Sequence, residues 1–349
     1  MQASIIAAEG AIGSMTKPAE ENHWVGFDLG GTKMLAVVYD SEFRPLGRDR
    51  TKSKGHEGGD AGLERIVATI RAALKDAKVD SEQLAGIGVG CPGPLDLDAG
   101  VILDTPNLGW QNVKVAKTLK SAFGCAAVIA NDVDAGVYGE FRFGAAKDTR
   151  CVLGVFPGTG IGGGCVYEGR IIRGKTTSCM EIGHVQVMPD GPRCGCGRYG
   201  CLEAVASRLA IAAAAATAAH RGDAPYLRSN TGTDMADIRS GALASSVRHG
   251  DKVVEQILRD AARHIGTAVA GAVHLMAPDM VVLGGGLVEA MPELFVEEVG
   301  DAARNRVMEP LVDSFTVTAA ELGDDASVLG AAAWAQQTIN GGILPRTRA

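Results

Sequence analysis

The pattern of hydrophobic and polar positions repeats once along the chain. Residues 24–40 read W-V-G-F-D-L-G-G-T-K-M-L-A-V-V-Y-D, an apolar strand, a glycine-rich turn and a second apolar strand. Residues 151–167, C-V-L-G-V-F-P-G-T-G-I-G-G-G-C-V-Y, follow the same order. Each segment predicts a β-hairpin with a polar tip. Two such hairpins can be unrelated turns, but their likeness also fits a duplicated scaffold whose turns oppose each other across a cleft.

Helix-like and strand-like segments alternate through the rest of the chain. Apolar residues at helical spacing predict helices, and short apolar runs bounded by Gly, Pro or Asn predict strands. The expected helices cover about 61–77, 202–219, 251–276 and 327–338. The expected strands lie within 85–96, 125–130, 279–287 and 314–319. This alternation indicates an α/β fold that binds ligands at strand ends.

At 349 residues the chain has room for two domains, each with its own core. We expect a leader over 1–22, a smaller N-terminal α/β domain over 23–138 and a larger C-terminal α/β domain over 139–340. The final helix, 327–338, is a candidate to pack back on the N-terminal domain. No low-complexity linker separates the two domains, so a compact hinge is expected.

Composition excludes several functional classes. The net charge is −7 and the Lys and Arg residues are scattered, which argues against a nucleic-acid surface. No apolar run approaches the roughly 20 residues that a membrane span needs. Residues 1–22 lack the basic segment and apolar core of a signal peptide. Five of the eight cysteines fall in or beside apolar strand-like runs, as reduced core residues do. We therefore expect a cytoplasmic protein.

Four potential metal ligands cluster in the segment 181–203. They are His184, Cys194, Cys196 and Cys201. One imidazole nitrogen and three thiolates form the closed tetrahedral set of a structural Zn²⁺, and the glycines at 195, 197 and 200 let a short loop bend round one ion. A disulfide is disfavoured because nothing suggests export and two of the cysteines are too close in sequence for comfortable bridge geometry. Glu181 and Glu203 flank the cluster without being needed by the metal, which indicates a polar ligand nearby.

The two glycine-rich turns suit phosphate binding, because their backbone N–H groups can point at phosphate oxygens. The first turn holds Gly30, Gly31, Thr32 and Lys33, and the second holds Gly158, Thr159 and Gly160. Lys33 can add a donor or simply face solvent. Asp28, at the end of the first strand, can hold Mg²⁺ directly or through water. Neither the P-loop pattern nor the Rossmann pattern fits these turns.

Asn131 and Asp132 follow the strand 125–130 where a helix begins. An Asp at a helix start is often an N-cap. The alternative is a general base at the mouth of a cleft, with Asn131 orienting a hydroxyl beside it. A carboxylate suits phosphoryl transfer, because in a loose transition state the acceptor loses its proton late. The pattern alone leaves both interpretations open.

Seven motifs occur along the chain in this order: D-L-G-G-T-K, C-P-G-P-L-D, T-P-N-L-G-W, N-D, G-T-G-I-G-G-G, E-I-G-H and C-G-C-G-R-Y-G-C-L-E. Together they resemble the ROK family (repressors, open reading frames and sugar kinases), over about residues 23–340. The resemblance implies an actin-like, hexokinase-like duplicated fold of two α/β domains that close on a sugar and ATP. It also implies Mg²⁺, a structural Zn²⁺ and a homo-oligomer, either a dimer or a tetramer.

The resemblance assigns roles to the matching positions. Asp132 would be the catalytic base. Sugar contacts would come from Asn131, Glu181, His184, Glu203, Gly93 and Asn107, with His184 bound to zinc at the same time. ATP and its Mg²⁺ would be held by Asp28, Gly30, Gly31, Thr32, Lys33, Gly158, Thr159 and Gly160. Adenosine would lie along Gly284, Gly285 and Gly286.

Two departures from the family pattern affect the expected pocket. Phe156-Pro157 stands where smaller or less rigid residues are usual, and the segment after Asp132 reads V-D-A-G where another Asn often appears. The loop T-P-N-L-G-W looks like the glucokinase version, whereas fructokinase-like members tend to carry a lysine near Asn107. Glucose is therefore the first expectation, phosphorylated at its 6-hydroxyl. N-acetylmannosamine, N-acetylglucosamine, mannose and fructose stay open.

Two other functional classes are weighed against a kinase. The repressors of the family carry a helix-turn-helix domain before the first turn, but 27 residues precede Asp28 and they contain no basic recognition helix. A non-catalytic sugar sensor would have no use for a base at Asp132. We therefore expect a sugar kinase, with no nucleic-acid or membrane partner.

Overall fold

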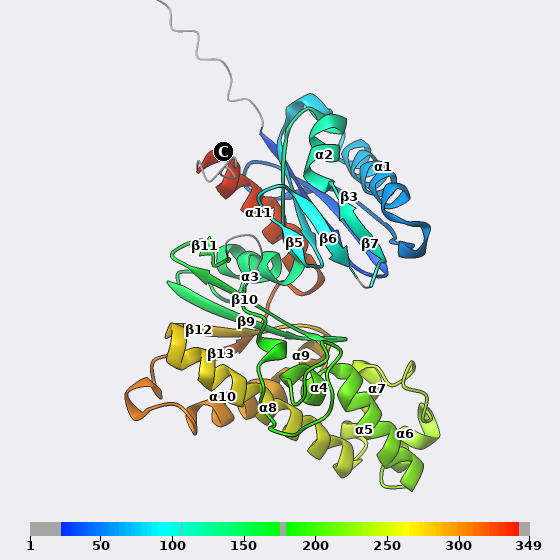
Figure 1. Cartoon of the computed structure of the whole chain (residues 1–349), viewed down its shortest axis with the longest axis vertical. Helices are drawn as coiled ribbons and strands as arrows, with labels where there is room; N and C mark the ends of the chain where they lie inside the picture. The colour runs from blue at the N-terminus through cyan, green and yellow to red at the C-terminus, as the bar shows by residue number, and fades with distance from the viewer. Residues whose placement is uncertain (1–21, 106, 175–178, 342–349) are drawn as a thin grey trace, which may run out of the picture.

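The computed structural model describes residues 22–105, 107–174 and 179–341. Of the expected leader, residues 1–21 lie outside this range. The chain forms two lobes stacked along its long axis, with the N-terminal lobe in blue to cyan and the C-terminal lobe in green to orange (Figure 1). Each lobe is built round one five-stranded sheet.

The N-terminal lobe contains β1 (His23–Leu29), β2 (Lys33–Tyr39), β3 (Pro45–Lys52), α1 (Gly59–Ala77), β4 (Leu84–Cys91), β5 (Leu95–Asp96), β6 (Val101–Thr105), β7 (Trp110–Val113), α2 (Val115–Phe123) and β8 (Ala126–Asn131). Helix α3 (Asp132–Phe143) follows and leads towards the other lobe. The short strands β5, β6 and β7 form a separate antiparallel sheet.

The C-terminal lobe contains β9 (Cys151–Pro157), β10 (Ile161–Tyr167), β11 (Arg170–Ile171), α4 (Leu202–Ala206), α5 (Arg208–Arg221), α6 (Pro225–Asn230), α7 (Ser240–Arg248), α8 (Lys252–Met276), β12 (Met280–Leu283), α9 (Gly286–Ala290), α10 (Pro292–Arg304) and β13 (Thr316–Ala319). The chain then returns through α11 (Ala326–Asn340). The strand expected over 279–287 ends earlier, at Leu283, because the glycines that follow start α9.

The two sheets have the same topology. Their strand orders are β3-β2-β1-β4-β8 and β11-β10-β9-β12-β13. In each sheet the first strand of the hairpin pairs antiparallel with the second and parallel with a later strand. Both hairpins that the sequence predicted are present, as β1–β2 and β9–β10.

Helices α3 and α11 connect the lobes by packing against each other and, for α11, against β1 and β4. This contact needs glycine. A Cβ on Gly26 or Gly88 would overlap a backbone carbonyl of α11, and a Cβ on Gly330 would overlap a carbonyl of α3. Between the two helices, Tyr138 meets Trp334 edge-on at 5.3 Å. These close backbone contacts fix the direction in which α3 enters the cleft.

A buried carboxylate ties together the two segments that cross between the lobes. Glu140, on α3, is fully buried. It accepts hydrogen bonds from the backbone N–H of Ala145 (2.9 Å), in the first crossing, and of Glu321 (3.1 Å) and Leu322 (2.8 Å), in the second. The boundary expected at 138/139 falls inside α3, and α11 packs on strands β1 and β4 of the N-terminal lobe.

The single helix expected over 202–219 is wrong in detail, because the chain breaks at Ser207. The Ser207 hydroxyl accepts a hydrogen bond from the N–H of Ala210 (3.3 Å) and caps the new helix α5. By length and composition, Leu202–Arg221 is the one stretch in the described part of the chain that could cross a membrane. Its residues Ile211, Ala215 and Ala219 are buried in the C-terminal core, so it is a core segment.

Candidate active site

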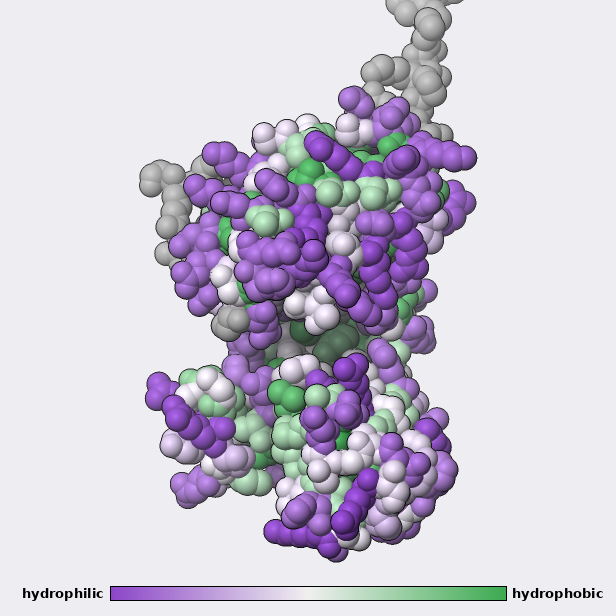
Figure 2. Space-filling view, turned by 90° about the vertical axis from the view of Figure 1, so that its right-hand side faces the viewer, coloured by the Kyte–Doolittle hydropathy of each residue, from purple (hydrophilic) through white to green (hydrophobic). Residues whose placement is uncertain are grey.

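The cleft between the lobes holds Asp28 and Asp132, two of the four acidic residues that the sequence singled out. Figure 2 shows the molecule hollowed at its waist, between the two lobes. A cavity of about 330 Å³ in this region is lined by Asp28, Asp132, Phe156, Gly285 and Gly286, and by Ser327 at the start of α11. Four carboxylates line it in all, since Glu289 and Asp324 join the first two. Strand β1, helix α3 and the glycine segment after β12 therefore converge here.

The start of α3 shows which side chains accept hydrogen bonds from its free N–H groups. Asp132 Oδ1 accepts one from the N–H of Val133 (3.0 Å). The N-cap is Asn131, whose side-chain oxygen accepts hydrogen bonds from the N–H groups of Val133 (2.9 Å) and Asp134 (3.3 Å). Asp132 is the first residue of the helix, so its carboxylate is not required as the N-cap. Burial raises the pKa of Asp132 and the nearby charge of Glu181 raises it further, while hydrogen bonds from backbone N–H groups and Asn131 lower it.

Asp28 stands opposite, at the end of β1. The hydroxyl of Ser327 donates a hydrogen bond to its Oδ1 at 2.8 Å. Burial raises the pKa of Asp28 to about 6, the Ser327 hydrogen bond opposes this shift, and the charges of Asp132 and Asp324 add to it. A site with several carboxylate oxygens and a hydroxyl is chemically suited to a hard cation such as Mg²⁺.

The first glycine-rich turn is supported from within its own lobe. The N–H of Gly30 donates to the carbonyl of Lys33 (3.0 Å) and closes the turn. Ser53, which is fully buried, donates its hydroxyl to the carbonyl of Gly30 (2.5 Å) and its N–H to the carbonyl of Thr32 (3.0 Å). The side chain of Asn107 lies beside Gly31, so the loop that carries it borders this turn.

The second turn is supported by the cysteine-rich segment. Gly158 donates its N–H to the carbonyl of Gly160 (2.8 Å). The N–H of Ile161 donates to the Glu203 carboxylate (3.0 Å), and a Cβ on Gly160 would overlap that carboxylate. One oxygen of the predicted sugar ligand Glu203 is therefore engaged by the turn. Arg208 completes the support, with its N–H on the carbonyl of Gly158 (2.9 Å).

The four predicted zinc ligands come together. The ligand atoms of His184, Cys194, Cys196 and Cys201 all lie within 4.8 Å of one another. The Sγ atoms of Cys196 and Cys201 are 3.7 Å apart, and Cys194 Sγ is 3.7 Å from His184 Nδ1. Tetrahedral zinc bonds of about 2.0–2.3 Å give ligand–ligand edges of about 3.6–3.8 Å, so the spacing fits a zinc ion and is far too long for a disulfide.

Two of the three glycines in this loop have the role that the sequence predicts. Gly197 (φ +88°) and Gly200 (φ +71°) occupy the left-handed region, which favours glycine. Gly195 has no positive φ and no neighbour that would clash with a side chain. The requirement predicted at position 195 is therefore not visible in the structure.

Phe156 fits because glycines surround it. Its ring occupies the space that a Cβ would need on Gly154 and Gly284, and it lies within van der Waals reach of Gly136. Gly285 (φ +83°) then turns the chain into α9. The ring of Phe156 therefore fills space that Gly136, Gly154 and Gly284 leave open, and it forms part of the cavity wall.

Several predicted residues have no contact that ties them to the site. Gly93 lies near Leu95 alone, and the Lys33 side chain is exposed. Glu181 and His184 are also exposed. The negative charge of Glu181 nevertheless contributes to the raised pKa of Asp132.

Sequence reasoning missed Ser327, Arg208 and Asp134. Ser327 and Arg208 carry weak signals: Arg208 is the one basic residue within 202–219, and Ser327 begins the last predicted helix. Asp134 was noted as a departure but given no role. It is buried, its Oδ1 has no hydrogen-bond partner among the described residues, and burial raises its pKa well above the ordinary value.

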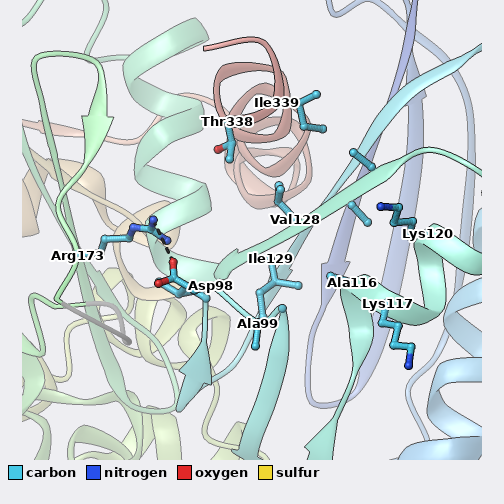
Figure 3. A pocket seen from close by; sticks show the side chains of 14 residues that line it. Asp98, Ala99, Ala116, Lys117, Lys120, Val128, Ile129, Arg173, Thr338 and Ile339 are labelled. Carbon is cyan, nitrogen blue, oxygen red and sulfur yellow. Dashed lines mark ion pairs between the residues drawn. The ribbon is translucent and has the colours of Figure 1, made fainter. Parts of the chain in front are cut away.

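A different cavity, of about 320 Å³, contains none of the predicted site residues. It lies between β8, α2, the end of α11 and the β5–β6 turn (Figure 3). Asp98 and Arg173 form an ion pair of 3.4 Å at one side of it. Because Asp98 belongs to the N-terminal lobe and Arg173 follows β11, this pair links the two lobes away from the phosphate turns.

The sequence profile of the ROK family matches residues 24–338. The chain belongs to the ROK family. It is 31% identical to a glucokinase of Thermotoga maritima over 319 residues, which cover 91% of this chain and 98% of that protein. The structure of a ROK family glucokinase from Streptomyces griseus, in complex with glucose and AMPPNP, is similar with a TM-score of 0.78 and 29% identity, and the match covers 90% of this chain and 100% of that one.

The family also contains regulators that resemble this chain. A putative xylose repressor of Caldicellulosiruptor is 30% identical over 88% of this chain, and the match covers 77% of the repressor. The family match and the duplicated sheets confirm the predicted actin-like fold of two α/β domains round a cleft.

Proposed function

We propose that this chain, a sugar kinase of the ROK family, transfers the γ-phosphoryl group of ATP to the 6-hydroxyl of glucose. One observation carries the proposal: Asp132 and Asp28 line one cavity in the cleft, and Thr32 of the first glycine-rich turn lines the cavity next to it. A phosphoryl donor held by the turns and an acceptor hydroxyl beside Asp132 would meet there. Such a meeting of donor and acceptor is what in-line phosphoryl transfer requires.

The proposed general base is Asp132. Its carboxylate takes the proton of the 6-hydroxyl as that oxygen bonds to the γ-phosphorus, the bond to the bridging oxygen of ADP breaks, and ADP leaves with the electron pair. Asn131 holds the start of α3 in place through its capping hydrogen bonds. Asp28 and Ser327 would hold Mg²⁺, which supplies positive charge to the phosphate oxygens when it is bound.

The zinc cluster is proposed to order the sugar side of the cleft. Since four protein ligands close the coordination sphere, a bound Zn²⁺ would stabilise the loop rather than take part in the reaction. His184 faces Cys194 with Nδ1, which leaves Nε2 for a sugar hydroxyl. Glu203 joins the cluster to the second turn, with Cys194 Sγ at 3.8 Å from one oxygen and the N–H of Ile161 at 3.0 Å from the other.

Glucose is proposed ahead of other hexoses because the loop T-P-N-L-G-W that carries Asn107 contains no lysine, and because the Thermotoga and Streptomyces relatives are glucokinases. The test is a coupled ADP-release assay with a panel of glucose, mannose, fructose, N-acetylmannosamine and N-acetylglucosamine. The highest kcat/KM is expected for glucose. A higher kcat/KM for another sugar would make that sugar the proposed substrate. If no sugar is phosphorylated, the kinase proposal is wrong.

A repressor function is not favoured. The net charge of −7 does not suit a DNA-binding surface, whereas the cleft keeps the proposed base Asp132. All eight cysteines are unbridged, which supports the cytoplasm as the proposed location.

A dimer or tetramer stays a proposal, and size-exclusion chromatography with light scattering would decide between them.

A further inference from the structure

We propose that Arg208 is a specificity-determining residue for the phosphate chain of the donor. The inference rests on the proposed function, because it concerns the donor half of the same cleft. Arg208 is the first residue of α5 and directly follows the Ser207 cap. Its backbone N–H holds the carbonyl of Gly158, and its Nη2 donates to the Thr159 hydroxyl at 3.1 Å. The guanidinium is therefore fixed at the second phosphate turn.

The charge of Arg208 is available to a ligand. A guanidinium stays protonated at all physiological pH values. The side-chain partner that the described part of the chain offers it is the neutral Thr159 hydroxyl and not a carboxylate. The side chain is neither fully buried nor fully exposed, so it can meet a ligand without leaving its anchor.

The cavity next to Arg208 reaches across the cleft. This cavity, of about 650 Å³, is lined by Arg208 and Arg239 from the C-terminal lobe and by Thr32 of the first turn. Ser240 also lines it, and the Ser240 hydroxyl lies 3.3 Å from where a Cβ on Gly286 would stand. Gly286 in turn lines the acidic cavity with Asp28 and Asp132. The two cavities are thus adjacent. The larger one is lined by Thr32 of the first turn and by Arg208, which is hydrogen-bonded to the second turn.

The two adjacent cavities carry opposite charge. The residues that line the smaller cavity include four carboxylates and no Lys or Arg. The residues that line the larger one include two arginines and no Asp or Glu. A polyphosphate chain is repelled by the first cavity unless a cation intervenes, and it is attracted by the second. Arginine also matches phosphate oxygens with a planar pair of donors, which a lysine does not.

This arrangement assigns Arg208 to the phosphate chain and not to the nucleoside. The experiment compares Arg208→Gln with the wild type, using adenosine, AMP, ADP, a non-hydrolysable ATP analogue and inorganic tripolyphosphate, each with Mg²⁺, in equilibrium binding. The affinity loss should grow with the number of phosphates. It should reach about 10- to 100-fold for the ATP analogue and tripolyphosphate, the effect of one charge-assisted hydrogen bond, and be absent for adenosine.

Two further variants separate this role from a merely structural one. Arg221→Gln makes the same change at the other end of α5, where the side chain is exposed, and should bind every ligand as the wild type does. Arg208→Lys keeps the charge and should restore part of the tripolyphosphate affinity. If Arg208→Gln weakens adenosine and ATP equally, or changes neither, the inference is wrong. If the wild type binds tripolyphosphate through Arg208 but phosphorylates no hexose, the proposed function fails while this inference stands.

Discussion

The two glycine-rich turns have the same local design but are supported in different ways. Each closes a hairpin of the same topology, and each is closed by one N–H to carbonyl bond. The first turn is held by Ser53 of its own lobe. The second is held by Glu203 and Arg208, which follow the cysteine–histidine cluster. The support of the first turn therefore involves no residue of the cysteine–histidine cluster, whereas the second turn is supported from the segment that follows this cluster. The two hairpins share the same strand topology but differ in the residues that support their turns.

The largest effect is expected from a change that leaves both turns intact. Asp132→Asn keeps the shape of the site and removes the proposed base, so kcat should fall about 10²- to 10⁴-fold while nucleotide affinity stays unchanged. Burial raises the pKa of Asp132. As pH is lowered, the kcat of the wild type should therefore begin to fall at a pH above about 4, the ordinary pKa of an aspartate. Steady-state kinetics from pH 4 to 9 measure both effects. The matched control is Asp60→Asn, at the exposed start of α1, which should keep the kcat of the wild type. A nearly normal kcat in Asp132→Asn would show that Asp132 is not the base.

Cys196→Ala should break the support of the second turn and spare that of the first. Loss of one ligand should lower zinc from about one ion per chain and reduce the unfolding temperature by roughly 10 °C, because metal binding here contributes to folding. Elemental analysis and calorimetry measure these quantities. Hydrogen exchange should increase at residues 158–160 and not at 30–32. Cys125→Ala, outside the cluster, serves as the control. Equal exchange at both turns would contradict the proposed dependence.

Asp134→Asn tests a further difference between the two hairpins. Asp134 is buried on α3, and its carboxyl lies against Gly164 of β10, the return strand of the second hairpin. Four titratable groups interact with Asp134. The charges of Asp132 and Glu181 raise the pKa of Asp134, and the charge of Asp134 in turn raises the pKa values of Cys165 and Cys179. A carboxyl whose folded pKa is raised binds more protons in the folded state, so its contribution to stability falls as pH rises above the unfolded pKa. The variant should therefore gain stability over the wild type as pH increases, by up to about 1.4 kcal/mol per pH unit. Urea unfolding from pH 4 to 8 measures this gain, and a difference independent of pH would disprove it.

The smallest effect is expected at the first turn. Ser53→Ala removes the hydroxyl that donates to the carbonyl of Gly30, at a cost of about 1 kcal/mol. The KM for ATP should rise about fivefold, while zinc content and the KM for sugar stay normal. Kinetics with varied ATP and varied sugar make the measurement. A loss of zinc in this variant would show that the two turns are not supported independently.

The local patterns in the sequence identified most of the elements that build the site. Alternating apolar positions located both hairpins, and helical spacing located α1, α8 and α11. The long alanine-rich segment misled this reasoning, because apolar spacing continues through 202–219 and the break depends on one serine hydroxyl at position 207. In the same way, the pattern placed a possible cap at Asp132, but the N-cap position belongs to Asn131, whose side chain accepts from two free N–H groups while Asp132 accepts from one.

The sequence by itself determined which four potential metal ligands cluster and where the two hairpins lie, because these depend on residue type and on short spacings. Only the tertiary structure decided which groups act together. Ser327 meets Asp28 across 299 positions, and Glu140 reaches the second crossing 181 positions away. Arg208 gains its importance from the absence of a carboxylate in the cavity that it lines with Thr32. Contacts between distant segments depend on how sheets and helices pack, and no local pattern along the chain records that packing.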